Sequence, residues 1–334
     1  MPERTAVVLF NMGGPDKLSA VQPFLFNLFN DKAIIGAPAP IRWCLAQYIS
    51  RKREAHAQDI YRKIGGRSPL LEQTKRQAKA LEEQLGGDHR CFVAMRYWHP
   101  FIEETVREVE AFAPDRLVLL PLYPQYSSTT TGSSFAGWEK LAGNLPAPAR
   151  ICCYPELSGL VQAFAEGLHA ALVEAARFGP PRVLFSAHGL PKFLIERGDP
   201  YQHQVERTAK AILERLGEKV DSQISYQSRV GPMEWIGPET SDEIRQAGEE
   251  HLPVIVVPLA FVSEHSETLV ELDIEYKKLA EESGVPCYLR VSTPIDHPAF
   301  IKSLAELVEH AQPGTKPGGK PCQGANLTCP GVLK

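Results

Sequence analysis

The chain has 334 residues, of which 43% are hydrophobic and 23% are charged, and its formal net charge is −4. This length allows two domains of about 150 residues each, and the weakly acidic balance argues against nucleic acid as a partner. The first residues, MPERTAVVLF, carry neither the apolar core nor the cleavage site of a signal peptide. No apolar run approaches the roughly 20 residues of a spanning helix, so we expect a cytoplasmic protein. The odd number of cysteines, 7, argues against a disulfide framework.

The first half, residues 1–150, alternates strand-like and helix-like segments, which predicts a parallel α/β architecture. A strand over 6–10 leads into the turn NMGGP at 11–15, and an apolar helix-like stretch occupies 21–49. A helix follows over 71–85, and strands are predicted at 91–97 and 117–122. The last of these strands runs into YPQYSSTTTGSS, a loop rich in hydroxyl groups.

The second half, residues 151–311, repeats this plan. RVLFSAHGLP at 182–191 matches AVVLFNMGGP, and ISYQSRVGP at 224–232 stands where the first half has VAMRYWHP. VIVVPLAFVSEHSETL likewise stands in the place of LVLLPLYPQYSSTTTGSS. The first half is longer, and its excess lies between 15 and 91, so an insertion over about 20–60 is predicted. Residues 312–334 form a tail rich in Gly, Pro and Lys, which we expect to lack regular structure.

The stretch 253–276, PVIVVPLAFVSEHSETLVELDIEY, carries the most unusual pattern. Residues 254–261 read as a buried strand, and a helix is expected after the loop FVSEHSE, with Ser263 or Ser266 as its N-cap. On that helix Glu267, Glu271 and Glu275 recur every four residues and share one face. This face is either simply solvated or an acidic track for protons or a cation, since open α/β sheets bind ligands at the carboxyl ends of their strands.

A histidine, His188, follows another buried strand, in the motif SAHGLP. A single histidine at such a position is commonly structural, but this one shares its strand-end edge with the loop that holds Glu264, His265 and Glu267. A histidine that faces carboxylates is suited to moving protons near neutral pH or to holding a divalent cation. No cysteine pair at metal-binding spacing accompanies it, and S-A-H-G is not the motif of a serine hydrolase.

The apolar cluster at 21–35 has two interpretations. It is either ordinary core or an exposed apolar lip, which would act as a pocket lid or a membrane-facing edge. Its position in an insertion that the second half lacks favours the lip. The cluster contains Phe24, Leu25, Phe26, Leu28, Phe29, Ile34 and Ile35.

Taken together, these motifs resemble those of the ferrochelatase family, the terminal metal-inserting enzymes of haem synthesis. The similar segments span about 5–310 and include SAHGLP, RGDPY, YQSRVGPMEWIGP and PLAFVSEHSETLVELDIEY, together with NMGGP, IGGRSPL, RYWHP and YPQYSSTTTGSS. The resemblance implies an α/β fold with two similar Rossmann-like, chelatase-type domains, each a four-stranded parallel sheet flanked by helices. It also implies a porphyrin cleft between the domains.

The resemblance further implies roles for individual residues. His188 and Glu267 match the catalytic pair, which would also bind the metal, and Glu264, His265, Glu271 and Glu275 match the acidic track behind them. The implied reaction inserts Fe²⁺, a substrate and not a prosthetic group, into protoporphyrin IX. The residues implied in porphyrin binding are Met12, Leu28, Phe29, Ile34, Arg96, Tyr97, Tyr123, Trp235 and Phe261.

The sequence departs from many relatives in its cysteines. Those relatives bind a [2Fe–2S] cluster through four cysteines, three of them in a C-terminal tail. Here the tail offers only Cys322 and Cys329, Val332 stands where the next ligand is expected, and Ser128 replaces the upstream cysteine of some relatives. We therefore expect no iron–sulfur cluster.

Two alternatives to a protoporphyrin enzyme stay open. One is a coproporphyrin III ferrochelatase of the same fold, whose substrate carries more propionates. The other is a two-domain protein that binds haem or metal without catalysis. The apolar 21–35 segment favours protoporphyrin, and it also predicts peripheral contact with a membrane surface. The expected assembly is a monomer or homodimer.

Overall fold

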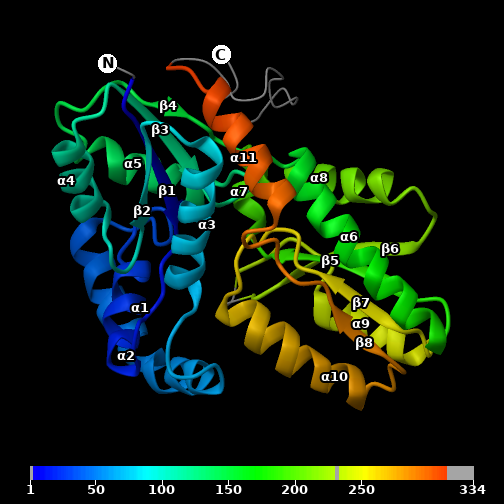
Figure 1. Ribbon diagram of the computed structural model, residues 1–334. Coiled ribbons are helices and arrows are strands. Elements are labelled where there is room, and N and C mark those ends of the chain that lie inside the picture. Colours follow the sequence, from blue (N-terminus) through cyan, green and yellow to red (C-terminus); the bar gives the residue numbers. More distant parts are fainter. Residues whose placement is uncertain (1–2, 230–232, 314–334) are drawn as a thin grey trace. The chain divides into compact units, whose positions relative to one another are not determined.

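The computed structural model describes residues 3–229 and 233–313 (Figure 1). The chain divides into two compact units, each described by itself below. The first unit runs to Cys153 and takes in the end of the last helix from Leu304, and the second runs from Tyr154 to Ser303.

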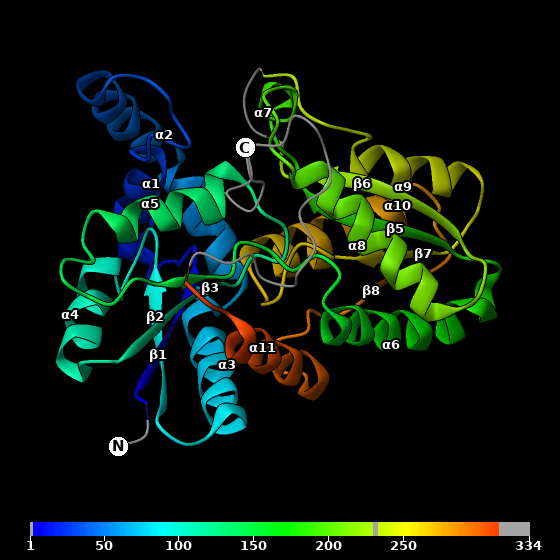
Figure 2. The same cartoon turned by 90° about the horizontal axis from the view of Figure 1, so that it is seen from above.

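The first unit is built on a parallel four-stranded sheet in the order β2-β1-β3-β4. Its central strand β1 is buried along its whole length, because its apolar run is covered on both faces. In both views α3 lies on one face of this sheet, and α4 and α5 lie on the other (Figure 2). The strands are β1 (Thr5–Asn11), β2 (His89–Met95), β3 (Arg116–Pro121) and β4 (Ala149–Arg150). The helices are η1 (Leu18–Ala20), α1 (Val21–Phe29), α2 (Ala39–Lys63), α3 (Leu70–Leu85), α4 (Ile102–Phe112), the π-helix η2 (Ser128–Gly132) and α5 (Ser133–Glu139).

The second unit repeats the arrangement with the strand order β6-β5-β7-β8, again all parallel. Helices α6 and α8 cover one face of this sheet, and α9 and α10 cover the other (Figures 1 and 2). This matching strand order confirms the predicted fold class of two similar four-stranded parallel sheets. The strands are β5 (Arg182–His188), β6 (Asp221–Gln227), β7 (Val254–Val257) and β8 (Tyr288–Arg290). The helices are α6 (Ser158–Ala175), η3 (Ala176–Phe178), α7 (Lys192–Glu196), α8 (Tyr201–Leu216), α9 (Thr240–Glu249), η4 (Glu267–Tyr276), α10 (Lys277–Glu282) and α11 (Pro298–His310).

Helices α1 and α2 form the segment that the second half lacks, and they divide the 21–35 cluster between core and surface. Phe24 and Leu25 are buried with Tyr61 and Tyr97, so the expectation that Phe24 faces outward is wrong. The period of a nine-residue helix turns both side chains toward α2 and the end of β2. The exposed apolar side chains lie further along the chain, at Ile34, Ile41, Trp43, Leu45 and Tyr48. None of the described helices is long and apolar enough to cross a membrane.

The strand and helix around the acidic motif also differ from expectation. Strand β7 ends at Val257, not at 261, because Pro258 has no N–H to donate and the chain turns there. The Leu259 N–H donates to the Val257 carbonyl at 2.9 Å. The helix that follows is a π-helix, η4, and Ser266 at its start makes no side-chain cap. The predicted tail lies almost wholly outside the described residues.

Candidate active site

The structure joins His188 and Glu267 directly. His188 is the last residue of β5, and Glu267 is the first residue of the π-helix η4. The imidazole Nδ1 donates to the Glu267 carboxylate at 2.9 Å. The His188 side chain keeps 38% of its surface exposed and that of Glu267 keeps 22%. A strand end and a helix start therefore hold an accessible acid–base pair, unlike a histidine satisfied within a core.

Opposing effects set the charge of this pair. Burial acts to lower the pKa of His188, but the charge and hydrogen bond of Glu267, helped by the charge of Glu271, raise it above the ordinary 6.5. Burial acts to raise the pKa of Glu267, and the charge and hydrogen bond of His188 outweigh it and lower the value to about 2. The pair with Glu267 therefore makes the His188 imidazole a stronger base than an ordinary histidine.

Glu271, four residues further along η4, is the second carboxylate of this site. It accepts hydrogen bonds from the Ser228 N–H at 2.9 Å, from the Ser228 hydroxyl and from the Tyr276 hydroxyl at 3.0 Å. Ser228 has a left-handed backbone (φ 63°), which places both of its donors on the same carboxylate. Burial and the neighbouring charge of Glu267 raise the pKa of Glu271. Glu271 is thus better suited than Glu267 to hold a proton near neutral pH.

His265 lies beside this pair and is almost fully buried. Its Nδ1 faces the backbone N–H of Glu267 at 3.4 Å, and its ring stacks on Phe261 with centroids 6.3 Å apart. Burial lowers the pKa of His265, the charge of Glu267 opposes that shift, and the charge of His188 adds to it. His265 is therefore a neutral imidazole that supports the start of η4.

The other two members of the predicted acidic track, Glu264 and Glu275, have different surroundings. Glu264 is buried and accepts hydrogen bonds from Arg290 at 3.0 Å and from the Thr293 N–H at 3.1 Å. Glu275 is exposed near the end of η4. Glu264 is therefore held in a buried ion pair, whereas Glu275 faces solvent.

In the first unit, four of the predicted porphyrin-binding residues gather around one apolar cluster. Met12, Leu28 and Phe29 are partly buried against it, and Tyr97 is part of it. Ile34 lies apart and is exposed. These side chains form an apolar group at the carboxyl end of β1 and β2, where a parallel sheet presents its loops to ligands.

Arg96 and Tyr97 meet a residue that the sequence did not single out, Asp31. Its carboxylate accepts from the Arg96 guanidinium at 2.8 Å and from the Tyr97 hydroxyl at 2.9 Å. Tyr123 is partly buried nearby. Burial raises its pKa, while the charge of Arg96 acts the other way. Asp31 lies in none of the motifs recognised in the sequence, and only its position next to the apolar cluster could have suggested a role.

Arg53 is a second residue that the sequence did not single out as part of a site. Its guanidinium lies 5.6 Å from the ring centroid of Phe29, and within the described ranges no ion pair joins it. Burial lowers its pKa. The signal for it was the basic run 51–53, which reads as an ordinary solvated segment. A half-buried cation on an aromatic face is a place for an anionic group.

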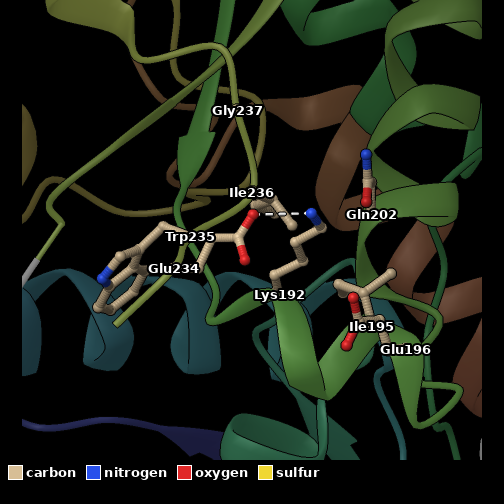
Figure 3. Close-up of a pocket in the computed structure, with 8 residues that line it drawn as sticks. All are labelled: Lys192, Ile195, Glu196, Gln202, Glu234, Trp235, Ile236 and Gly237. Atoms are coloured by element: carbon tan, nitrogen blue, oxygen red, sulfur yellow. Dashed lines mark hydrogen bonds and ion pairs between the residues drawn. The ribbon is translucent and has the colours of Figure 1, made fainter. Parts of the chain in front are cut away.

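A cavity of about 340 Å³ lies in the second unit, lined by Lys192, Ile195, Glu196, Gln202, Glu234, Trp235, Ile236 and Gly237. Lys192 and Glu234 form an ion pair of 2.7 Å across it, and the indole of Trp235 extends away from that pair (Figure 3). A Cβ added at Gly189 would lie 3.3 Å from the Trp235 ring. Glycine next to His188 therefore lets Trp235 pack closely beside the candidate active site.

Among residues 3–229 and 233–313, no group of three or more His, Cys, Asp or Glu side chains is arranged to hold a metal ion. His188 offers one imidazole as a ligand, and Glu267 offers one carboxylate. Cys322 and Cys329, on which the expectation about a cluster depends, lie outside the described residues. Cys152 and Cys153 have their sulfur atoms 3.6 Å apart.

Known proteins similar to this chain agree on one family. The ferrochelatase family model matches residues 4–312. A ferrochelatase of Caulobacter vibrioides is 53% identical over 323 residues, covering 95% of this chain and 93% of the relative. One from Phenylobacterium zucineum is 54% identical over 308 residues, covering 91% and 90%. One from Rickettsia bellii is 49% identical over 313 residues, covering 92% and 86%.

Two solved structures share the fold at low sequence identity. CbiX, described as the terminal enzyme for biosynthesis of sirohaem in denitrifying bacteria, has a TM-score of 0.50 at 15% identity and covers 92% of this chain and 99% of its own. DR2241 from Deinococcus radiodurans, described as structurally similar to chelatases, has a TM-score of 0.51 at 14% identity, covering 94% and 56%. The family match over nearly the whole chain and the relatives at about half identity show that this chain belongs to the ferrochelatase family of metal chelatases.

Proposed function

We propose that this ferrochelatase inserts Fe²⁺ into protoporphyrin IX to form protohaem, with His188 and Glu267 handling the pyrrole protons and the metal. Family membership makes the chain a lyase that inserts iron into a porphyrin, the terminal step of haem biosynthesis. The observation that carries the residue assignment is the hydrogen bond of 2.9 Å between His188 at a strand end and Glu267 at the start of a π-helix.

The chemistry of insertion explains this pair. Two pyrrole N–H bonds break and four Fe–N bonds form, so two protons must leave the ring. Because Nδ1 of His188 is bound to Glu267, its Nε2 is the nitrogen that accepts a proton from the substrate. Glu267 stabilises the imidazolium that results. His188 accepts the two protons one after the other, and Glu271, whose pKa is raised, takes up each of them in turn and passes it toward solvent.

Ferrous iron enters this scheme as a substrate. The carboxylate of Glu267 is a hard oxygen donor, and the imidazole of His188 is a borderline nitrogen donor, so the pair suits brief contact with a hydrated divalent ion. Two facing side chains bind a metal more weakly than a complete site does, which suits an ion that must move on to the porphyrin.

Porphyrin binding is assigned by residue type in each half. In the half proposed as 1–150, Met12, Leu28 and Phe29 offer apolar contacts to the macrocycle, and Arg53 offers a cation to one of its propionates. In the half proposed as 151–311, Trp235 and Phe261 offer aromatic contacts beside the catalytic pair. A flat apolar ring held this way can be bent by binding energy so that its nitrogen lone pairs become accessible.

A spectroscopic assay tests this function against the alternatives. The purified protein is incubated with protoporphyrin and either Fe²⁺ without oxygen or Zn²⁺, and the absorption spectrum is followed. We expect many turnovers of metalloporphyrin per protein. A protein that binds porphyrin in a fixed ratio without turnover would be a binding module, and the proposal would then be wrong. Faster turnover with coproporphyrin III would identify the other enzyme.

A peripheral membrane contact is the second part of the proposal. Ile41, Leu45 and Tyr48 lie at helical spacing on α2 and are exposed, and the basic residues 51–53 follow them. Burying such a side chain in lipid is worth about 1.5–3 kcal/mol, enough for reversible attachment.

Replacing Ile41 and Tyr48 with serine is expected to weaken binding to anionic liposomes by at least about tenfold, measured by co-sedimentation. The free energy of unfolding should stay near that of the unaltered protein, because both side chains face solvent. Phe178→Ser, at an exposed aromatic position in the second unit, serves as the control. Unchanged liposome binding in the double variant would contradict the lipid contact.

The cofactor proposal is that the protein holds no [2Fe–2S] cluster. Its support is the sequence alone, since Cys322 and Cys329 cannot supply four ligands. The purified protein should show no visible absorption from a cluster and no stoichiometric acid-labile sulfide. A brown protein with labile sulfide would show that other thiols complete a site.

A further inference from the structure

Asp31 is a buried carboxylate between α1 and α2, and four donors converge on it. It accepts from the Arg96 guanidinium at 2.8 Å, the Tyr97 hydroxyl at 2.9 Å, the Ser133 hydroxyl and the Ala33 N–H at 2.9 Å. Its side chain is only 6% exposed. These donors come from its own loop, from the end of β2 and from the start of α5, so one carboxylate ties three segments together.

The pair that Asp31 forms with Arg96 removes a free cation from this part of the molecule. One terminal nitrogen of Arg96 binds Asp31, and its Nε donates to the Ser133 hydroxyl at 2.8 Å. The guanidinium also lies 5.3 Å from the ring centroid of Tyr97. Its side chain is 27% exposed, so a ligand can still approach it, but its charge is already compensated.

The residues around the Asp31–Arg96 pair show why compensation of the Arg96 charge matters for porphyrin binding. The other first-half residues that the family resemblance implies in porphyrin binding are neutral: Met12, Leu28, Phe29, Ile34, Tyr97 and Tyr123. Arg96 is the single cation among them, and Asp31 cancels it. By contrast, Arg53, at Phe29, has no ion pair in the part of the chain that the structure describes. Arg53 is thus left to bind a carboxylate, whereas the charge of Arg96 is already compensated by Asp31.

We propose that Asp31 is a specificity-determining residue that, by neutralising Arg96, favours protoporphyrin over porphyrins with additional carboxylates. This inference rests on the proposed function. A carboxylate brought next to a compensated Asp31–Arg96 pair would lose hydration without gaining an unpaired cation, whereas a vinyl group there loses nothing. Asp31 also positions the loop that carries Ile34, because its main-chain carbonyl accepts from the Ile34 and Ile35 N–H groups at 3.1 and 2.9 Å.

The decisive variant is Asp31→Asn, which keeps the side chain's shape and an oxygen for the Ala33 N–H while leaving the Arg96 guanidinium uncompensated. The measurement is kcat/KM for Zn²⁺ insertion into protoporphyrin and into coproporphyrin III. We expect the ratio of the two to shift toward coproporphyrin by at least about tenfold, which corresponds to about 1.4 kcal/mol. The double variant Asp31→Asn/Arg96→Gln should return the ratio to within about threefold of the unaltered protein.

A purely structural role for Asp31 predicts a different pattern. Both substrates would then lose rate together, and removing Arg96 would not restore the ratio. If Asp31→Asn does not fold, Arg96→Gln alone tests the same idea, because it leaves a buried anion and should shift the ratio toward protoporphyrin. Asp59→Asn, at an exposed carboxylate of α2, is the control and should leave the ratio unchanged.

The failure of this inference is distinguishable from that of the proposed function. If the unaltered protein inserts metal into neither porphyrin, the proposed function is wrong. If it inserts metal into protoporphyrin while Asp31→Asn and Arg96→Gln both leave the substrate ratio unchanged, Asp31 does not determine specificity and only this inference is overturned.

Discussion

His188→Ala is expected to leave a folded protein that binds protoporphyrin within about threefold of the normal affinity but inserts metal at least about 100-fold more slowly. The magnitude follows from the 10²–10⁴-fold that a positioned acid or base typically contributes. The reason is the geometry: His188 is the strand-end base that Glu267 orients, and no other imidazole in the described residues makes a hydrogen bond to Glu267 as short as 2.9 Å. Porphyrin binding is followed by fluorescence and insertion by absorbance.

His203→Ala provides the matched control. His203 lies on α8 with about half of its side chain exposed, and its nearest carboxylate is Glu206 at 3.9 Å. This variant should insert metal at the normal rate. If His188→Ala also turned over normally, His188 would be a structural residue and the assignment of the proton acceptor would be wrong.

Glu267→Gln is expected to cut turnover far more than Glu275→Gln, again by about 100-fold or more. Glu267 holds the imidazolium of His188 through a charged hydrogen bond, and a neutral amide cannot do so equally well. Glu275 is exposed and lies eight residues after Glu267 on η4. Steady-state kinetics on both variants, with thermal denaturation to confirm folding, make the comparison.

Equal losses in the two glutamine variants would contradict this distinction. They would mean that the carboxylates of η4 act collectively or serve the fold. Glu271→Gln separates these cases further, since Glu271 contacts Ser228 and Tyr276 and should show an intermediate loss.

The sheets could be predicted from the sequence because their signal is local. Buried parallel strands such as Val254–Val257 are short apolar runs, and the repetition of such runs in the same order indicated two similar sheets. The strands β4 and β8 were not located individually, because two or three residues carry too little pattern. Phe24 was misplaced because an apolar cluster does not reveal which of its faces another helix will cover.

The candidate site was only partly predictable. The motif placed His188 and Glu267 at strand ends, and the structure brings them into contact across 79 positions of sequence. Arg290 pairs with Glu264, and Ser133 donates a hydrogen bond to Asp31. The two partners in each pair are distant in sequence, so tertiary folding alone brings them together. The π-helical geometry of η4 was equally hidden, since ordinary helix spacing was the natural assumption for Glu267, Glu271 and Glu275.

The pH dependence of kcat/KM tests the proton-acceptor role of His188 most directly. Insertion requires the neutral imidazole, and Glu267 raises the pKa of His188, so the rate should fall as pH drops through a value above 6.5. In Glu267→Gln the opposing charge is gone and burial lowers that pKa, so the residual activity should persist to lower pH. We expect an acid limb displaced to lower pH in Glu267→Gln, and an acid limb at the same pH in both proteins would contradict the proton-acceptor role of His188.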